Sequence, residues 1–326
     1  MDNTHKKKQI LLYCASTLGI LGVLIVLVYQ LLGGAFSKTQ NKPKKFGATY
    51  MTMDNLYFEA FNSRLAEVID ANGDILITRD PSQNQEKQNE QILDMIDAGV
   101  DLIFVNPADW KKITPALIAC NEAHVPLINV DTNVYDKQYV NSIVLSDNYG
   151  AGVLIAKDVM AKRKSAKIVI MDHESINSTH LRVQGFLDTI KGSSLDYEIV
   201  AFITTTSTLE SSMEKMQEVI DQGVAFDVVF GGNDPTALGA LAAMQKNHAG
   251  KGVLLYGIDG SPAGKAMIKK GYMEGSSAQF PLLMAQQAAK MAYDLLDKKP
   301  IDQLVYVPVQ LITKENIDKF DFTGWQ

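Results

Sequence analysis

From residue 46 onward the chain alternates short apolar, β-branched runs with longer stretches whose apolar residues recur at helical spacing. Phe58, Phe61 and Leu65 share one helical face, and Ala285 and Ala292 share another. Strands that alternate with helices in this way are typical of a parallel α/β sheet. The runs predict strands at residues 46–51, 74–78, 101–106, 126–130, 142–146, 167–171, 198–203, 227–231, 253–258 and 304–312.

About ten strands are more than one open sheet usually holds. We therefore expect an α/β protein with two similar doubly wound parallel-sheet lobes. Ligands of such sheets bind beyond the carboxyl ends of the strands, so a cleft between the lobes is the predicted binding site.

The N-terminal part of the chain has a different pattern. Residues 10–32 form a run of 23 residues without a charge, which as a helix would span ~34 Å, about the thickness of a bilayer core. The run predicts one transmembrane helix that anchors the chain in the lipid bilayer, with residues 1–9 in the cytoplasm and residues 33–45 as a linker. The alternative is a cleaved signal peptide, whose apolar core is shorter, at ~7–15 residues.

Charge and cysteine content exclude several classes of function. The net charge is −6, but residues 1–45 hold seven lysines and one acid, which leaves 24 basic and 36 acidic residues beyond them. So acidic a body would repel phosphates, and we expect no nucleic acid partner. Cys14 and Cys120 are the two cysteines, and they form neither a CxxC metal motif nor a disulfide framework.

Polar residues follow most of the predicted strands. Carboxylates and amides dominate, and Tyr57 and Phe58 add two aromatic rings. Such a rim can hydrogen-bond many hydroxyls while a ring stacks on the apolar face of a sugar. For Asp54, Asp147, Asn148 and Asp234, helix capping explains the position equally well. We favour Asp131 and Asp259 as ligand residues, because each ends an apolar run, whereas Arg182 taken alone is typical of a solvated side chain.

Seven stretches resemble, in order and spacing, the periplasmic sugar-binding proteins of the D-ribose-binding type, which share their fold with the ligand domains of LacI-type repressors. The resemblance covers about residues 46–314 and is carried by MDNLYFEAF, LINVDTN, LSDNYGAG, LRVQGF, VFGGNDPTALGAL, LYGIDGSPAG and SAQFPLLMA. It implies a sugar-binding cleft, and it implies these ligand residues: Asn55, Tyr57, Phe58, Asp131, Arg182, Asn233, Asp259 and Gln279.

Two departures from that family concern the choice of sugar. Thr132 stands where the ribose-type pattern has an arginine, and an aromatic of the second lobe is replaced near Ser207. The loss of a bidentate donor and of a stacking face changes which hydroxyls fit. We include Thr132 among the ligand-binding candidates, and a pentose, a hexose and a polyol all stay open.

The resemblance also implies three crossovers between the lobes, near Ser146, Gln279 and Pro308. They form a three-strand hinge and divide the chain into lobe 1 at 46–146 and 280–308, and lobe 2 at 147–279 and 309–326. Closure about this hinge would bury the sugar.

Catalysis has little support in the sequence. His173 and His180 are seven residues apart without an HExxH motif, and the chain has no GxSxG elbow or P-loop. We expect no catalytic residue, no metal and no cofactor; a sugar-active enzyme on the same fold is the alternative. A LacI-type repressor would carry a helix-turn-helix where the apolar run stands.

We therefore expect an extracytoplasmic sugar-binding protein. Its partner is either an ABC permease, which receives the sugar, or a membrane histidine kinase, which senses closure. The binding domain lies outside the cytoplasm, at the cell membrane if the N-terminal helix stays or in the periplasm if it is cleaved.

Overall fold

The computed structural model describes residues 6–7, 19, 21–28 and 42–325. The chain divides into a unit of residues 1–43 and a unit of residues 44–326. In the first unit residues 21–28 are helical. Among the described residues no helix is both long and apolar enough to cross a bilayer. Most of the predicted anchor, residues 10–32, lies outside the described residues, so the anchor stays a prediction.

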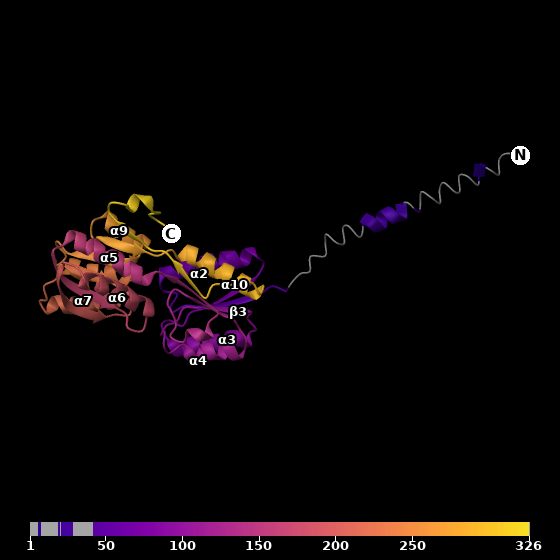
Figure 1. Ribbon diagram of the computed structural model, residues 1–326, viewed down its shortest axis with the longest axis horizontal. Helices are drawn as coiled ribbons and strands as arrows, with labels where there is room; N and C mark the ends of the chain where they lie inside the picture. The colour runs from indigo at the N-terminus through magenta and orange to yellow at the C-terminus, as the bar shows by residue number, and fades with distance from the viewer. Residues whose placement is uncertain (1–5, 8–18, 20, 29–41, 326) are drawn as a thin grey trace. The chain divides into compact units, whose positions relative to one another are not determined.

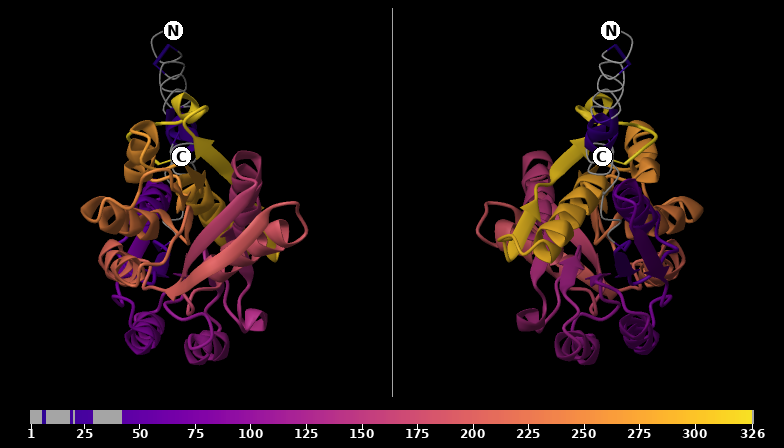
Figure 2. Two further views of the ribbon diagram at one scale, coloured as in Figure 1. Left: turned by 90° about the vertical axis from the view of Figure 1, so that its left-hand side faces the viewer. Right: turned by 90° about the vertical axis from the view of Figure 1, so that its right-hand side faces the viewer.

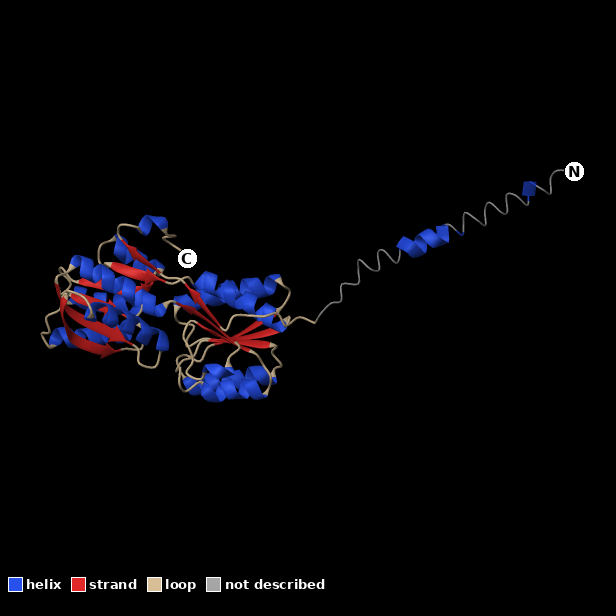
Figure 3. Cartoon of the chain, viewed as in Figure 1, coloured by secondary structure: helices blue, strands red, loops and turns tan. Residues whose placement is uncertain are grey.

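The second unit contains two six-stranded sheets with helices around them (Figures 1 and 3). Lobe 1 is built on the sheet with strand order β11-β5-β4-β3-β1-β2, in which all neighbours are parallel. Its elements are β1 (Lys45–Thr49), α2 (Leu56–Ala71), β2 (Ile75–Arg79), α3 (Gln85–Asp97), β3 (Leu102–Val105), α4 (Thr114–Glu122), β4 (Leu127–Val130), η1 (Lys137–Tyr139), β5 (Ser142–Ser146), α10 (Pro281–Leu296) and β11 (Leu304–Val307).

Lobe 2 is built on the sheet with strand order β12-β10-β9-β8-β6-β7. Its elements are α5 (Asn148–Lys162), β6 (Ser165–Asp172), α6 (Asn177–Lys191), β7 (Asp196–Thr204), α7 (Leu209–Asp221), β8 (Val228–Gly231), α8 (Asp234–Lys246), β9 (Leu254–Asp259), α9 (Pro262–Lys269), β10 (Gly275–Ala278), β12 (Gln310–Thr313) and η2 (Ile317–Lys319). The chain passes between the two sheets after β5, after β10 and between β11 and β12.

Helices cover both faces of each sheet, which confirms the two-lobed α/β architecture. In lobe 1, α2 and α10 cover one face and α3 and α4 the other (Figure 1), and the views along the long axis show the same separation (Figure 2). In lobe 2, α5 and α6 pack on one face and α7, α8 and α9 on the other. Strands such as Leu102–Val105 are wholly buried because both of their faces are covered.

Two strand predictions were wrong. The sequence predicted no strand at Gly275–Ala278, because GSSA lacks the β-branched residues that mark a strand, yet this segment is β10. The predicted strand 304–312 is two strands in different sheets, divided around Pro308. The second of them, β12, runs antiparallel to β10, so the lobe 2 sheet is mixed.

Helices α5 and α6 pack unusually closely, and this packing positions the site. A Cβ atom at Gly152 of α5 would collide with the backbone oxygen of Arg182 in α6, and one at Gly185 would collide with the backbone of Tyr149. The two glycines therefore let the helix backbones meet. This contact fixes α6 at the turn that carries Arg182.

Candidate sugar-binding cleft

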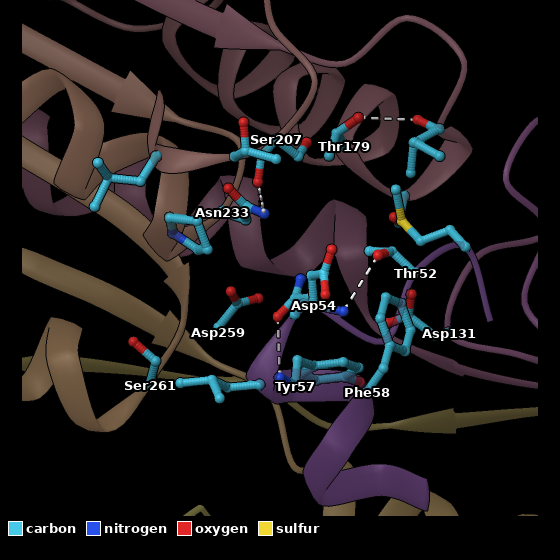
Figure 4. A pocket seen from close by; sticks show the side chains of 18 of the residues that line it. Thr52, Asp54, Tyr57, Phe58, Asp131, Thr179, Ser207, Asn233, Asp259 and Ser261 are labelled. Atoms are coloured by element: carbon cyan, nitrogen blue, oxygen red, sulfur yellow. Dashed lines mark hydrogen bonds between the residues drawn. The ribbon is translucent and has the colours of Figure 1, made fainter. Parts of the chain in front are cut away.

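A cavity of about 520 Å³ lies between the lobes, within the ~300–1,000 Å³ usual for small-molecule sites. Its walls come from segments that follow strands of both sheets, as expected for this fold. Ser207 and Asn233 of lobe 2 lie across the pocket from Tyr57 and Phe58 of lobe 1 (Figure 4). The cavity brings together all nine residues predicted from the sequence: Asn55, Tyr57, Phe58, Asp131, Thr132, Arg182, Asn233, Asp259 and Gln279.

The turn after β1 supplies the aromatic wall. Asn55 caps α2, and its side-chain oxygen accepts a hydrogen bond from the Tyr57 backbone N–H at 3.0 Å. The ring centroids of Tyr57 and Phe58 are 5.3 Å apart in an edge-to-face arrangement, and both side chains are buried. Burial, followed by the charge of Asp131, raises the pKa of Tyr57, so its hydroxyl stays protonated, and it donates to the Met284 sulfur at 3.7 Å.

Asp131 follows β4 with a strained backbone. Its φ of 63° lies in the left-handed region, which costs a residue other than glycine about 1–3 kcal/mol. The Asn106 amide donates to its carboxylate at 3.1 Å and the Thr132 hydroxyl at 3.2 Å. Burial raises the pKa of Asp131, and the Arg182 guanidinium opposes this shift. The strain and the hydrogen bonds aim a desolvated carboxyl group into the cavity.

Asp259 follows β9 and is also strained, with a φ of 140°. Gln279 donates to one oxygen of its carboxyl group at 2.8 Å, and the Asp234 backbone N–H donates to the other at 3.3 Å. Burial, followed by the charge of Asp234, raises the pKa of Asp259 to about 8. The side-chain oxygen of Gln279 is buried and has no partner among the described residues, so it can accept a hydrogen bond from a ligand.

Arg182 is the cationic group of the cavity wall. Its side chain is 3% exposed; Nε donates to the Asn148 side-chain oxygen and Nη1 to the Gly232 carbonyl, both at 2.8 Å. Among the described residues none accepts a hydrogen bond from Nη2. This fixed nitrogen can donate to a ligand hydroxyl, and a solvated surface role for Arg182 is excluded.

Asn233 caps α8, accepting a hydrogen bond from the Thr236 N–H at 2.9 Å, and its amide donates to the Ser207 carbonyl. The expectation that Asp54 and Asp234 cap helices was wrong by one residue, because Asn55 and Asn233 take that position. Asp234 instead accepts hydrogen bonds from Ser261 and Ser276 next to Asp259.

Asp147 does cap its helix, accepting from the Gly150 N–H at 2.9 Å. Its neighbour Asn148 has a different role, since it lies inside α5 and holds Arg182. The sequence left helix capping and ligand contact equally open for both residues; capping holds for Asp147 and not for Asn148.

The sequence missed two further contributors to the cleft. The Ser178 hydroxyl lies 2.8 Å from the Thr132 hydroxyl, and this hydrogen bond joins the lobes directly. Trp325, from the C-terminal tail, lines the cavity beside Tyr57. The residue pattern gives no signal for either one: Ser178 lies in the first turn of α6, away from a strand end, and Trp325 follows the last regular element.

Two α/β lobes joined by three crossovers, with a polar and aromatic cavity between them, define a two-lobed ligand-binding protein. The family described as "Periplasmic binding protein domain" matches residues 46–300. The chain belongs to this family, and the resemblance seen in the sequence is confirmed.

Relatives and solved structures agree with this assignment. The chain is 28% identical over 290 residues to the ribose import binding protein of Bacillus subtilis, covering 86% of this chain and 90% of the relative. An ABC transporter solute-binding protein from Bacillus halodurans, solved with bound myo-inositol, superposes with a TM-score of 0.80 at 22% identity, covering 86% of this chain and 98% of that one.

A second solute-binding protein, from Agrobacterium vitis with bound D-fucose, superposes with a TM-score of 0.79 at 23% identity, covering 84% of this chain and 97% of that one. At this identity the structural matches establish the fold. Both solved proteins and the ribose relative are described as binding proteins, which confirms for the family the prediction of a binding rather than an enzymatic protein.

Proposed function

We propose that this chain binds a monosaccharide or a similar polyol in the interlobe cleft, outside the cytoplasm, and closes on it. The main support for this proposal is the chemistry of the cavity wall. Buried carboxyl groups, amides and one arginine offer hydrogen bonds to many hydroxyls, while Tyr57 and Phe58 offer an apolar face. Proteins of the same family bind ribose, myo-inositol and D-fucose, which share this ligand chemistry.

The test is a thermal-shift screen of the full chain with D-ribose, D-allose, D-fucose, myo-inositol and xylitol. A ligand present at 100 times its dissociation constant stabilises the folded state by ~2.7 kcal/mol, which is a clear shift of Tm. A shift with at least one of these compounds supports the proposal, and no shift with any of them overturns it.

Calorimetry with the compound that binds then tests the site. Asp259→Ala is expected to abolish detectable binding, because it removes the ligand contact and leaves the buried Gln279 amide without its acceptor, at a cost of ~1–3 kcal/mol for each buried polar group left unsatisfied. Tyr57→Ala is expected to weaken binding through the lost ring. Unchanged affinity in either variant would remove that residue from the proposed site.

For the partner, we propose an ABC permease, because both solved proteins described above are ABC transporter solute-binding proteins. The alternative is a membrane histidine kinase that senses closure. Reconstituted in proteoliposomes, the permease of the same cell should hydrolyse ATP faster when this chain and its sugar are added. Stimulation of a kinase instead, with no effect on ATP hydrolysis by the permease, would favour sensing.

We also propose that residues 10–32 anchor the chain in the membrane with the binding lobes outside. The support is the run of 23 uncharged residues, which is longer than the apolar core of a signal peptide. Mass spectrometry of the protein from the membrane fraction should give the full-length mass. A soluble, shortened product would show cleavage and contradict the anchor.

A further inference from the structure

The tail that follows β12 connects the two lobes. Its first part belongs to lobe 2, where Ile317 and Phe320 pack in the core under α8 and α9. Its end reaches the other lobe, because Trp325 packs against the core of lobe 1. In Figure 1 this yellow segment runs from η2 to the junction of the lobes. The tail therefore leaves lobe 2 and places Trp325 against lobe 1.

Lys265 fixes the path of the tail. It lies in α9, is fully buried, and its ammonium group donates hydrogen bonds to the carbonyl oxygens of Asp321 and, at 2.7 Å, Gly324. The Asp321 side chain in turn accepts from the Thr323 N–H at 2.9 Å. Because two backbone carbonyls of the tail accept hydrogen bonds from one buried ammonium group, the segment before Trp325 has little conformational freedom. The backbone position of Trp325 is therefore fixed.

Trp325 forms part of the cavity wall. Its ring centroid is 5.6 Å from that of Tyr57, at an interplanar angle of 82°, and its side chain is partly buried. Among the described lining residues Trp325 is the one aromatic residue that lobe 2 provides, whereas lobe 1 provides Tyr57 and Phe58. Ser207, on the lobe 2 side, offers a hydroxyl and no ring.

We propose that Trp325 is a specificity-determining residue that favours cyclic sugars over acyclic polyols. This inference rests on the proposed function. A rigid ring ligand presents a continuous apolar face of C–H groups, and an indole fixed beside Tyr57 can cover that face. An acyclic polyol must be ordered before it presents such a face, so it gains less from the indole.

The experiment compares binding by the full chain and three variants in calorimetric titrations with D-ribose, D-allose, D-fucose, myo-inositol and xylitol. Trp325→Ala should weaken the best-bound cyclic ligand about tenfold and xylitol much less, while Trp325→Phe, which keeps a ring, should stay within about threefold of the wild type.

The matched control is Phe322→Ala. Phe322 is an aromatic residue of the same tail that lies against Lys269, outside the described lining of the cavity. The affinities of the Phe322→Ala variant for these ligands should equal those of the wild type. Thermal unfolding of each variant verifies that it is folded before titration.

The outcomes separate the two proposals. If the wild type binds a cyclic ligand and Trp325→Ala binds it equally well, the inference about Trp325 is overturned and the proposed function stands. The inference is also overturned if Phe322→Ala weakens binding as much as Trp325→Ala does. The same holds if Trp325→Ala weakens the binding of cyclic ligands and of xylitol equally, because either result would mean that the tail only supports the structure of the site. If the wild type binds none of the five, the proposed function fails and the inference falls with it.

Discussion

At the scale of single residues, the cleft is assembled from groups that are costly to bury or to strain. Asp131, Ser207 and Asp259 all line the cavity with φ values in the left-handed region. Residues other than glycine persist there only where their surroundings hold them. Here the surroundings are side-chain donors such as Asn106 and Gln279, which leave the carboxyl groups fixed before any ligand arrives.

The raised pKa of Asp259 predicts a pH dependence of stability. Its pKa is about 8 in the folded protein and ~3.9 in an unfolded chain, so between about pH 4 and 8 the folded state binds the extra proton. The protonated carboxyl group of Asp259 therefore adds to the free energy of unfolding. This contribution is complete below about pH 4 and is lost as the pH rises through 8. Asp259→Asn mimics the protonated form, so it should reduce the dependence of the free energy of unfolding on pH.

The measurement is Tm by circular dichroism at pH 5 and pH 8. The fall in Tm between these values should be several degrees larger for the wild type than for Asp259→Asn, since 1 kcal/mol corresponds to ~2–4 °C in a chain of this size. Equal falls would show that Asp259 does not titrate in this range.

Arg182 gives a second prediction at this scale. Arg182→Met keeps much of the buried stem but removes all the donors, so binding of the preferred sugar should weaken at least tenfold. Because the substitution also leaves the Gly232 carbonyl and the Asn148 oxygen without their donor, some stability is lost as well. Asn148→Ala is the comparison: it frees Nε alone, and calorimetry should place its affinity between those of the wild type and Arg182→Met.

At the scale of elements, the sequence predicts well where one physical signal dominates. Strands β3 and β4 are buried on both faces and appear as unbroken apolar runs. Strand β10 was missed because its four small residues carry no strand signal, although their size suits the wholly buried position they occupy. The capping positions shifted by one residue because Asn-Asp and Asp-Asn pairs can cap equally well from sequence alone.

The contact between α5 and α6 supports a prediction about Gly152. Gly152→Ala should lower the free energy of unfolding by about 1–3 kcal/mol, because its methyl group meets the backbone of Arg182 and the helices must separate. The shift should also move the Arg182 side chain and weaken sugar binding.

The matched control is Gly192→Ala at the end of α6, where an added Cβ atom meets nothing within 4 Å. Urea unfolding monitored by circular dichroism measures both variants. If Gly152→Ala were as stable as Gly192→Ala, the two helices would not depend on this close approach.

At the scale of the whole molecule, the site depends on how distant segments meet. The predicted residues other than Arg182 lie at or just beyond the carboxyl end of a strand of their sheet, whereas Arg182 lies inside α6 and was named only from the family resemblance. Trp325 and Ser178 could not be predicted, because their positions depend on how the lobes close and on how Lys265 holds the tail. Such contacts join residues far apart in the chain and leave no local pattern in the sequence.

Closure of the lobes can be tested at the hydrogen bond between Thr132 and Ser178. The hydroxyl oxygens are 2.8 Å apart, so cysteines at both positions would lie within reach of a disulfide when the lobes are closed. A bound sugar that favours the closed state should raise the rate of crosslinking of Thr132→Cys/Ser178→Cys under mild oxidation, read as a mobility shift on non-reducing gels.

The two single-cysteine variants are the controls, because they show whether either new cysteine pairs with a native one, Cys14 or the buried Cys120. Thr132 itself borders the ligand, so calorimetry must first show that the double variant still binds its sugar. Given binding, a rate that the sugar leaves unchanged would mean that the lobes meet equally often with and without ligand. The cleft would then bind by a preformed geometry, and the partner could not read closure as its signal.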